Sequence, residues 1–130
     1  MSLQQHLEHA STLAIEGRAF IDGQHVDAAT GACFDCVSPI DGRVLQRVAC
    51  CGEADVDRAV SAARRAFESG AWSKLPPRER KAVLQRWAAL LRQHAPELAL
   101  LESLDSGKPI ADTTGADLPS AIYCLEWFAE

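Results

Sequence analysis

The sequence predicts an α/β chain that consists of an N-terminal helix, two β-hairpins and then four mostly amphipathic helices. Three observations support this prediction. Apolar residues recur at helical spacing near the N-terminus and again throughout the second half of the chain. Between these regions, short apolar runs flank two stretches of turn-forming residues. The chain length leaves room for one domain with a modest core.

The first predicted element is a helix near the N-terminus. Leu3, Leu7, Ala10 and Ala14 recur on one helical face, and Gly17 offers a C-terminal stop. We therefore expect residues 1–17 to form an N-terminal helical segment.

Two hairpins are predicted next. Asp22-Gly23 separates two short apolar stretches in FIDGQHV, which is the signal of a two-residue hairpin turn. Further on, CFDCV and VLQRVA flank SPIDGR, whose Pro39, Asp41 and Gly42 are turn residues.

The second half of the chain predicts helices. Residues 53–69 carry acids in their first turn, are followed by Gly70, and place on one face Val56, Val60, Ala63 and Phe67. A second helix enters at Pro76-Pro77, and its apolar stripe consists of Val83, Leu84, Trp87, Leu90 and Leu91.

Two further helices follow. Pro96 ends the second helix and starts another, which stops at Gly107 and buries Leu98, Leu101 and Leu104. The last helix begins near Asp117 or Leu118, and the residues expected to face inward are Ala121, Ile122, Leu125 and Phe128. These stripes present more apolar surface than the short strands can cover, so we expect the chain to be a piece of a larger fold that needs a partner surface.

Composition and charge exclude several classes of function. The net charge is -5, which argues against nucleic acid or an anionic membrane as a partner. No apolar run is long enough for a membrane span, and the N-terminus lacks the layout of a signal peptide, so we expect a cytoplasmic location. The five cysteines, an odd number, favour reduced thiols over a disulfide framework.

Motifs that carry chemistry are scarce. The chain has no G-x-G-x-x-G motif, phosphate-binding loop or serine nucleophile elbow. Metal-ligating residues occur at Cys33-x-x-Cys36, Cys50-Cys51 and the pair His6 and His9. Strand geometry turns Cys33 and Cys36 to opposite faces, so small hydrophobic roles are favoured over a zinc site.

Two other groups have unremarkable interpretations. Cys124 lies between apolar neighbours and is expected to be a buried, inert thiol. A basic side of the second long helix is expected to be a solvated face, and it consists of Arg78, Arg80, Lys81, Arg86 and Arg92.

One acid is misplaced for a helix. Asp105 falls in the last turn of its helix, where the unpaired carbonyls are already negative, so the sequence indicates a need for positive charge there. Lys108 three residues on, or solvent screening, are alternatives to a bound cation.

Three segments resemble the N-terminal part of the aldehyde dehydrogenase superfamily. They are FIDGQHVDAATGACFDCVSPIDGRVLQRVA, ADVDRAVSAARRAFESGAWSKLPPRERKAVLQRWAALL and ELALLESLDSGKPI. The resemblance runs from about residue 18 to residue 130, and Gly70-Ala71-Trp72-Ser73 and the LDSGKP motif are its most specific parts. Within the superfamily the chain most resembles the bacterial gamma-glutamyl-gamma-aminobutyraldehyde dehydrogenases of putrescine breakdown. The resemblance implies that residues 18–130 are the N-terminal part of a truncated cofactor-binding domain.

The resemblance also implies an activity and its partners. Members oxidise an aldehyde to a carboxylate with NAD or NADP, through a cysteine thiolate and a glutamate that activates water. This chain contains neither the G-Q-x-C context of that cysteine nor the cofactor site, so we expect no catalytic and no cofactor-binding residue in it and no activity of the isolated 130 residues. The implied partners are the remainder of the fold, the aldehyde and further copies in a homo-oligomer.

Two site assignments come from the same resemblance. A monovalent cation would be held by the Asp105 carboxylate and the backbone carbonyl of Val37, just before the S-P turn. Ala116 and Ser120 would line the substrate entrance, where small side chains suit a long polar aldehyde.

A different class of function stays open at this point. The chain would then be a self-contained helical binding or interaction module with a closed core and a cysteine-bound metal.

Overall fold

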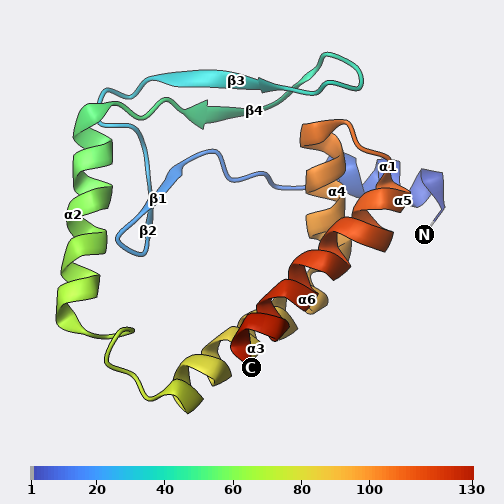
Figure 1. Cartoon of the computed structure of the whole chain (residues 1–130). Coiled ribbons are helices and arrows are strands. Elements are labelled where there is room, and N and C mark those ends of the chain that lie inside the picture. The colour runs from blue at the N-terminus through green and yellow to red at the C-terminus, as the bar shows by residue number, and fades with distance from the viewer. Residues whose placement is uncertain (1) are drawn as a thin grey trace. The chain divides into compact units, whose positions relative to one another are not determined.

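The computed structural model describes residues 2–130. Its elements in chain order are α1 (Leu3–Thr12), β1 (Ala19–Ile21), β2 (Gln24–Val26), β3 (Cys33–Val37), β4 (Val44–Ala49), α2 (Glu53–Ser69), α3 (Pro77–Gln93), α4 (Ala95–Ser106), α5 (Ile110–Asp112), the π-helical segment η1 (Thr113–Asp117) and α6 (Leu118–Ala129) (Figure 1). They form two compact units. The first contains residues 2–14, 38–42 and 76–130, and the second contains residues 15–37 and 43–75.

Both predicted hairpins are confirmed in the second unit. β1 and β2 pair antiparallel with Ile21 opposite Gln24, and the turn residues Asp22 and Gly23 have φ values of 54° and 77°. Positive φ at both central residues is what a two-residue type I′ turn requires. β3 and β4 also pair antiparallel, with an irregularity between Cys36 and Val37.

Gly17 does not stop a helix, contrary to the prediction. α1 ends at Thr12 and the next residue, Leu13, is extended. Residues 15–18 run along β4 instead, where the Ala49 N–H donates to the Gly17 carbonyl at 2.8 Å. A Cβ atom at Gly17 would lie 2.2 Å from the Arg47 carbonyl oxygen. Glycine is therefore required here because two backbones approach closely, not because a helix ends.

Asp55 joins α2 to the loop that follows the first hairpin. Its carboxylate accepts hydrogen bonds from the backbone N–H of Ala29 at 3.0 and 3.2 Å and from that of Gly52 at 3.0 Å. Arg58 donates to the same carboxylate at 2.6 Å. The Gly52 bond, with Arg58 and Ala29, holds the pKa of this carboxyl below its ordinary value. Since only 1% of Asp55 is exposed, the side chain is a buried anchor for the second unit.

In the first unit α6 runs beside α3, as Figure 1 shows. Two ion pairs tie these helices together: Arg92 contacts Glu126 through two bonds of 2.5 and 2.6 Å, and Lys81 contacts Glu130 at 2.5 Å. Part of the basic side of α3 is therefore engaged with α6. Both side chains stay exposed to solvent, as predicted for this face, although the ion pairs with α6 were not predicted.

The boundaries of the other helices match the sequence pattern. α2 ends before Gly70, α3 and α4 divide just before Pro96, and α6 starts at Leu118. α4 ends at Ser106 with Gly107 in the left-handed conformation, as predicted. The turn α5 and the segment η1 were missed.

The predicted inward faces are only partly buried. The buried hydrophobic residues are Ala28, Ala62, Ala88, Ala99, Leu100, Leu104, Ile122 and Ala129. Several stripe residues are exposed instead, namely Val56, Val60, Phe67, Trp87, Leu90 and Phe128, and Ala121 is exposed as well. The prediction that Ala121 and Phe128 face inward was wrong. The exposure of the apolar stripes agrees with the expectation that they need a partner surface.

Within residues 2–130, the structure contains no helix that is both long enough and apolar enough to cross a membrane.

Candidate functional site

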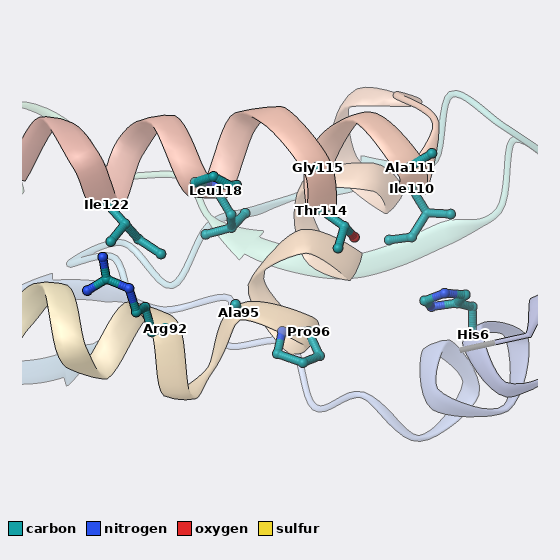
Figure 2. A pocket seen from close by; sticks show the side chains of 11 residues that line it. His6, Arg92, Ala95, Pro96, Ile110, Ala111, Thr114, Gly115, Leu118 and Ile122 are labelled. Atoms are coloured by element: carbon teal, nitrogen blue, oxygen red, sulfur yellow. The ribbon is translucent and has the colours of Figure 1, made fainter.

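A groove of about 880 Å³ lies in the first unit between two helical walls (Figure 2). One wall is the run from α5 through η1 to α6, and the other is the corner between α3 and α4. Both walls are mainly apolar, and the apolar residues that line them include Ala95, Pro96, Ile110, Leu118 and Ile122. His6 from α1 lies near one end and Arg92 near the other (Figure 2).

The shape of the upper wall depends on η1. The Leu118 N–H donates to the Thr113 carbonyl, five residues back, as in a π-helix. Thr113 is fully buried and its hydroxyl donates to the Ile110 carbonyl at 3.2 Å. The small residues Thr114 and Gly115 line the groove beside it. π-Helical turns of this kind often occur at functional sites.

Arg92 is held at its end of the groove by Glu126. This side-chain hydrogen bond raises the pKa of Arg92 and lowers the pKa of Glu126. The guanidinium uses two of its donors on the carboxylate, which fixes its orientation. Arg92 therefore ties α3 to α6 and is not presented to a ligand as an isolated cation.

His6 closes the other end. Its Nδ1 atom is buried and has no hydrogen-bond partner among the described residues. The polar side chains on the groove wall are His6, Arg92 and Thr114, and none of the wall residues carries a carboxylate or a thiol. The groove can thus accommodate apolar surface, but its own residues provide no nucleophile with a base.

Ala116 and Ser120, the predicted entrance residues, lie on the same helical run but not on the groove wall. Both are exposed, while their neighbours Gly115 and Pro119 line the groove. Two different sides of one helix therefore carry the groove and the predicted entrance. The assignment of Ala116 and Ser120 to a substrate entrance stays a prediction.

Val37 and Asp105, the predicted cation ligands, belong to different compact units. Asp105 is exposed near the end of α4, and Val37 is the last residue of β3. In the first unit, the loop after Val37 meets the turn after Asp105, since a Cβ atom at Gly107 would lie 3.0 Å from Pro39 Cγ. The cation assignment stays a prediction.

Lys108, the alternative considered for neutralising Asp105, pairs with a second acid. Its ammonium contacts Asp117 at 2.5 Å, and this hydrogen bond raises the pKa of Lys108.

We expect Asp105→Ala to remove a dependence of stability on the kind of monovalent cation. The unsubstituted chain should melt roughly 3–5 °C higher in potassium than in a bulky organic cation at equal ionic strength, because a bound ion stabilises the folded state. Asp105→Ala should melt at one temperature in both salts. If the unsubstituted chain is indifferent to the ion and the variant is at least as stable, Asp105 is only a tolerated acid at a helix end.

None of the five cysteines, all of which lie within residues 2–130, forms a disulfide in the structure. Cys33, Cys50 and Cys51 are exposed and Cys36 is half-buried. Cys124 is exposed, so the prediction of a buried thiol was wrong; α6 turns this residue outward while Ile122 faces inward. Across residues 2–130 no three His, Cys, Asp or Glu side chains are grouped so as to hold a metal ion.

Sequence reasoning missed the structural roles of Asp55 and of the Lys108–Asp117 pair. For Asp55 a local signal existed: it stands three residues after Gly52 at the helix start and three before Arg58. For the Lys108–Asp117 pair no signal existed, because its nine-residue spacing fits no helical repeat.

Comparison with known proteins decides the family. The sequence model of the aldehyde dehydrogenase family matches residues 25–130. The chain belongs to this family. The resemblance found in the sequence is thereby confirmed, and the fold is part of an aldehyde dehydrogenase fold.

The names of relatives within the aldehyde dehydrogenase family refer to different aldehydes. The chain is 48% identical over 130 residues to the aminoacetaldehyde dehydrogenase of Pseudomonas aeruginosa, covering 100% of this chain and 26% of that protein. It is 46% identical over 123 residues to the NADP/NAD-dependent aldehyde dehydrogenase PuuC of Escherichia coli, covering 95% of this chain and 25% of that protein. The chain therefore spans about a quarter of the length of these relatives.

Solved structures of aldehyde dehydrogenases match the fold closely. The gamma-glutamyl-gamma-aminobutyraldehyde dehydrogenase of Burkholderia cenocepacia superimposes with a TM-score of 0.97 at 64% identity, covering 99% of this chain and 26% of that one. The indole-3-acetaldehyde dehydrogenase of P. syringae in complex with NAD+ and IAA gives a TM-score of 0.97 at 53% identity, with coverage of 99% and 26%.

Proposed function

We propose that this chain is the N-terminal portion of an NAD(P)-dependent aldehyde dehydrogenase that oxidises an aldehyde to a carboxylate. The aldehyde we propose is gamma-glutamyl-gamma-aminobutyraldehyde. One observation carries the proposal, namely the 64% identity and TM-score of 0.97 to the Burkholderia cenocepacia enzyme over 99% of this chain.

The described residues do not by themselves fit a dinucleotide. A dinucleotide site of the usual kind needs a parallel sheet whose strands lead through a glycine-rich turn into a helix. Both sheets described between residues 2 and 130 are two-stranded and antiparallel. We therefore derive no step through the cofactor and assign this chain a positioning role: it supplies helical walls and the predicted entrance.

The exposed apolar faces define what the chain needs as a partner. Val56, Val60 and Phe67 form one stripe on α2, and Trp127 and Phe128 lie exposed on α6. We infer that the remainder of an aldehyde dehydrogenase fold covers such surfaces, that the complete enzyme is a homo-oligomer and that it works in the cytoplasm.

The alternative function, a self-contained binding module with a cysteine-bound metal, has little support. Its closed core is not observed, because large apolar side chains stay exposed on both α2 and α6. The family match over residues 25–130 also favours the enzyme.

A chimeric enzyme tests the proposal. Residues 1–130 would replace the matching quarter of the Burkholderia cenocepacia dehydrogenase, and turnover of gamma-glutamyl-gamma-aminobutyraldehyde would be followed as NADH absorbance. We expect kcat/KM within about tenfold of the parent enzyme, because the replaced part carries no reacting group. The isolated 130 residues should show no turnover above blank and no binding of NAD+.

Two results would contradict this proposal. Turnover by the isolated chain would place catalytic groups within it. A chimera that folds and assembles like the parent, but oxidises no aldehyde, would show that this chain does not provide what the family enzymes need from this region.

A further inference from the structure

The helical run from Ile110 to Ala129 contains one irregular turn. α5 and α6 are separated by the five residues of η1, closed by the bond from the Leu118 N–H to the Thr113 carbonyl. A π-turn amounts to an α-helix with one extra residue. If η1 relaxed to a regular α-helix, α6 would rotate by roughly one residue, or about 100°, relative to α5.

This rotation decides which side chains face the groove. With η1 in place, Gly115, Leu118 and Ile122 line the groove (Figure 2). Ala116 and Ser120 are exposed and do not line it. A change of about 100° would turn Leu118 and Ile122 away from their present direction and would turn Ser120 with them. The direction of Ala116 and Ser120 therefore depends on η1 being kept.

The intrinsic helix propensities of the residues in η1 do little to keep it. Gly115 is a poor helix former, and Thr113 and Thr114 are β-branched. The N-terminal side is fixed on α4, because the buried Ser103 hydroxyl donates to the Lys108 carbonyl at 2.6 Å. The buried side chain of Thr113 fixes the first residue of η1.

One ion pair spans the irregular turn from end to end. Lys108 precedes α5, and its Nζ contacts Oδ2 of Asp117, the last residue of η1, at 2.5 Å. The two side chains are 47% and 33% exposed, so the pair contributes little to overall stability. A small contribution is enough to choose between two arrangements of a short segment when their free energies are close.

We propose that the Lys108–Asp117 ion pair is a latch that keeps η1 in its π-helical form and thereby fixes the direction of Ala116 and Ser120. Lys108 and Asp117 are positioning residues for the substrate entrance. The part of this inference that concerns substrate rests on the proposed function. The part that concerns η1 rests on the geometry alone.

The first test uses the 130-residue chain and amide hydrogen exchange. Asp117→Ala should speed exchange of the amides of residues 113–118 about tenfold, while those of α3 stay within twofold of the unsubstituted chain. Asp112→Asn is the matched control, because Asp112 acts on Lys108 only through its charge and makes no hydrogen bond to it in the structure. Lys108→Arg keeps the charge and should retain most of the protection.

The second test uses the chimeric enzyme and separates KM from kcat. Asp117→Ala should raise KM for gamma-glutamyl-gamma-aminobutyraldehyde about fivefold and leave KM for acetaldehyde within twofold. A merely structural role would lower the amount of active enzyme and so reduce the apparent kcat equally for both aldehydes. The conservative variant Lys108→Arg should keep the KM values of the unsubstituted chimera for both aldehydes.

The outcomes are distinguishable. Unchanged exchange of residues 113–118 in Asp117→Ala overturns the latch. Faster exchange with an unchanged ratio of KM values overturns its role in positioning the entrance. If the unsubstituted chimera is inactive, the proposed function fails, and the exchange experiment still decides whether this ion pair holds η1.

Discussion

Replacing Asp55 by alanine is expected to lower the midpoint of thermal unfolding by about 10 °C. The change removes an acceptor that serves the N–H groups of Ala29 and Gly52 as well as the Arg58 guanidinium. Removing this buried acceptor breaks all of these hydrogen bonds at once, including the one to the Ala29 N–H, 26 residues away in sequence. Circular dichroism gives the midpoint, and faster exchange of the Ala29 amide identifies the lost contact.

The lowered pKa of Asp55 predicts how the stabilising effect of this side chain changes with pH. The folded-state pKa of Asp55 lies below its ordinary value of 3.8, so ionised Asp55 stabilises the folded chain. This stabilisation is complete above about pH 4 and is lost as the pH falls through the lowered pKa. The difference in midpoint between the unsubstituted chain and Asp55→Asn should therefore be constant from pH 5 to 7 and shrink below pH 4.

Asp57→Ala is the matched control, since Asp57 is an exposed acid two residues further along α2. It should change the midpoint by no more than about 2 °C. Equal effects of Asp55→Ala and Asp57→Ala would mean that the charge near the helix start matters and the anchoring contacts do not.

A tryptophan at Ser120 is expected to raise KM for bulky aldehydes about tenfold in the chimeric enzyme. Ser120 is exposed in the first turn of α6, on the side predicted to line the substrate entrance. A large side chain there narrows the entrance for gamma-glutamyl-gamma-aminobutyraldehyde but leaves room for acetaldehyde. KM for acetaldehyde should accordingly stay within about twofold.

Ala121→Trp provides the comparison for this experiment. It adds the same side chain at an exposed position of α6 that is turned by about 100° from Ser120. Its effect on the two aldehydes should be equal. If Ser120→Trp also affects both aldehydes equally, Ser120 does not line the entrance.

Local features of the fold were predictable from sequence. The turn at Asp22-Gly23 and the helix ends before Gly70 and Gly107 depend on the conformations of one or two residues, which their own chemistry specifies. The division of α3 from α4 at Pro96 is equally local. The role of Gly17 was predicted wrongly because its contact is with Arg47, thirty positions along the chain.

Burial and site geometry were less predictable. The stripe containing Val56, Val60 and Phe67 indicates which face of α2 is suited to burial, but not that residues 2–130 cover it. The groove depends on η1, and a π-turn has no compositional signature beyond weak helix formers such as Gly115. The family resemblance, carried by short motifs, was more reliable than either.

The close passage of residues 15–18 along β4 has a consequence for strand addition. An unprotected edge strand invites pairing with other chains, which leads to aggregation. The edge of β4 is occupied near Gly17, because the Ala49 N–H is bonded to the Gly17 carbonyl and the Gln46 side chain to the Ile15 carbonyl at 2.6 Å. This part of β4 is therefore not open to a further strand, whereas the other edge of β3 is paired with no strand within residues 2–130. A side chain at position 17 would push residues 15–18 away from β4. The edge of β4 would then also be open to pairing with other chains.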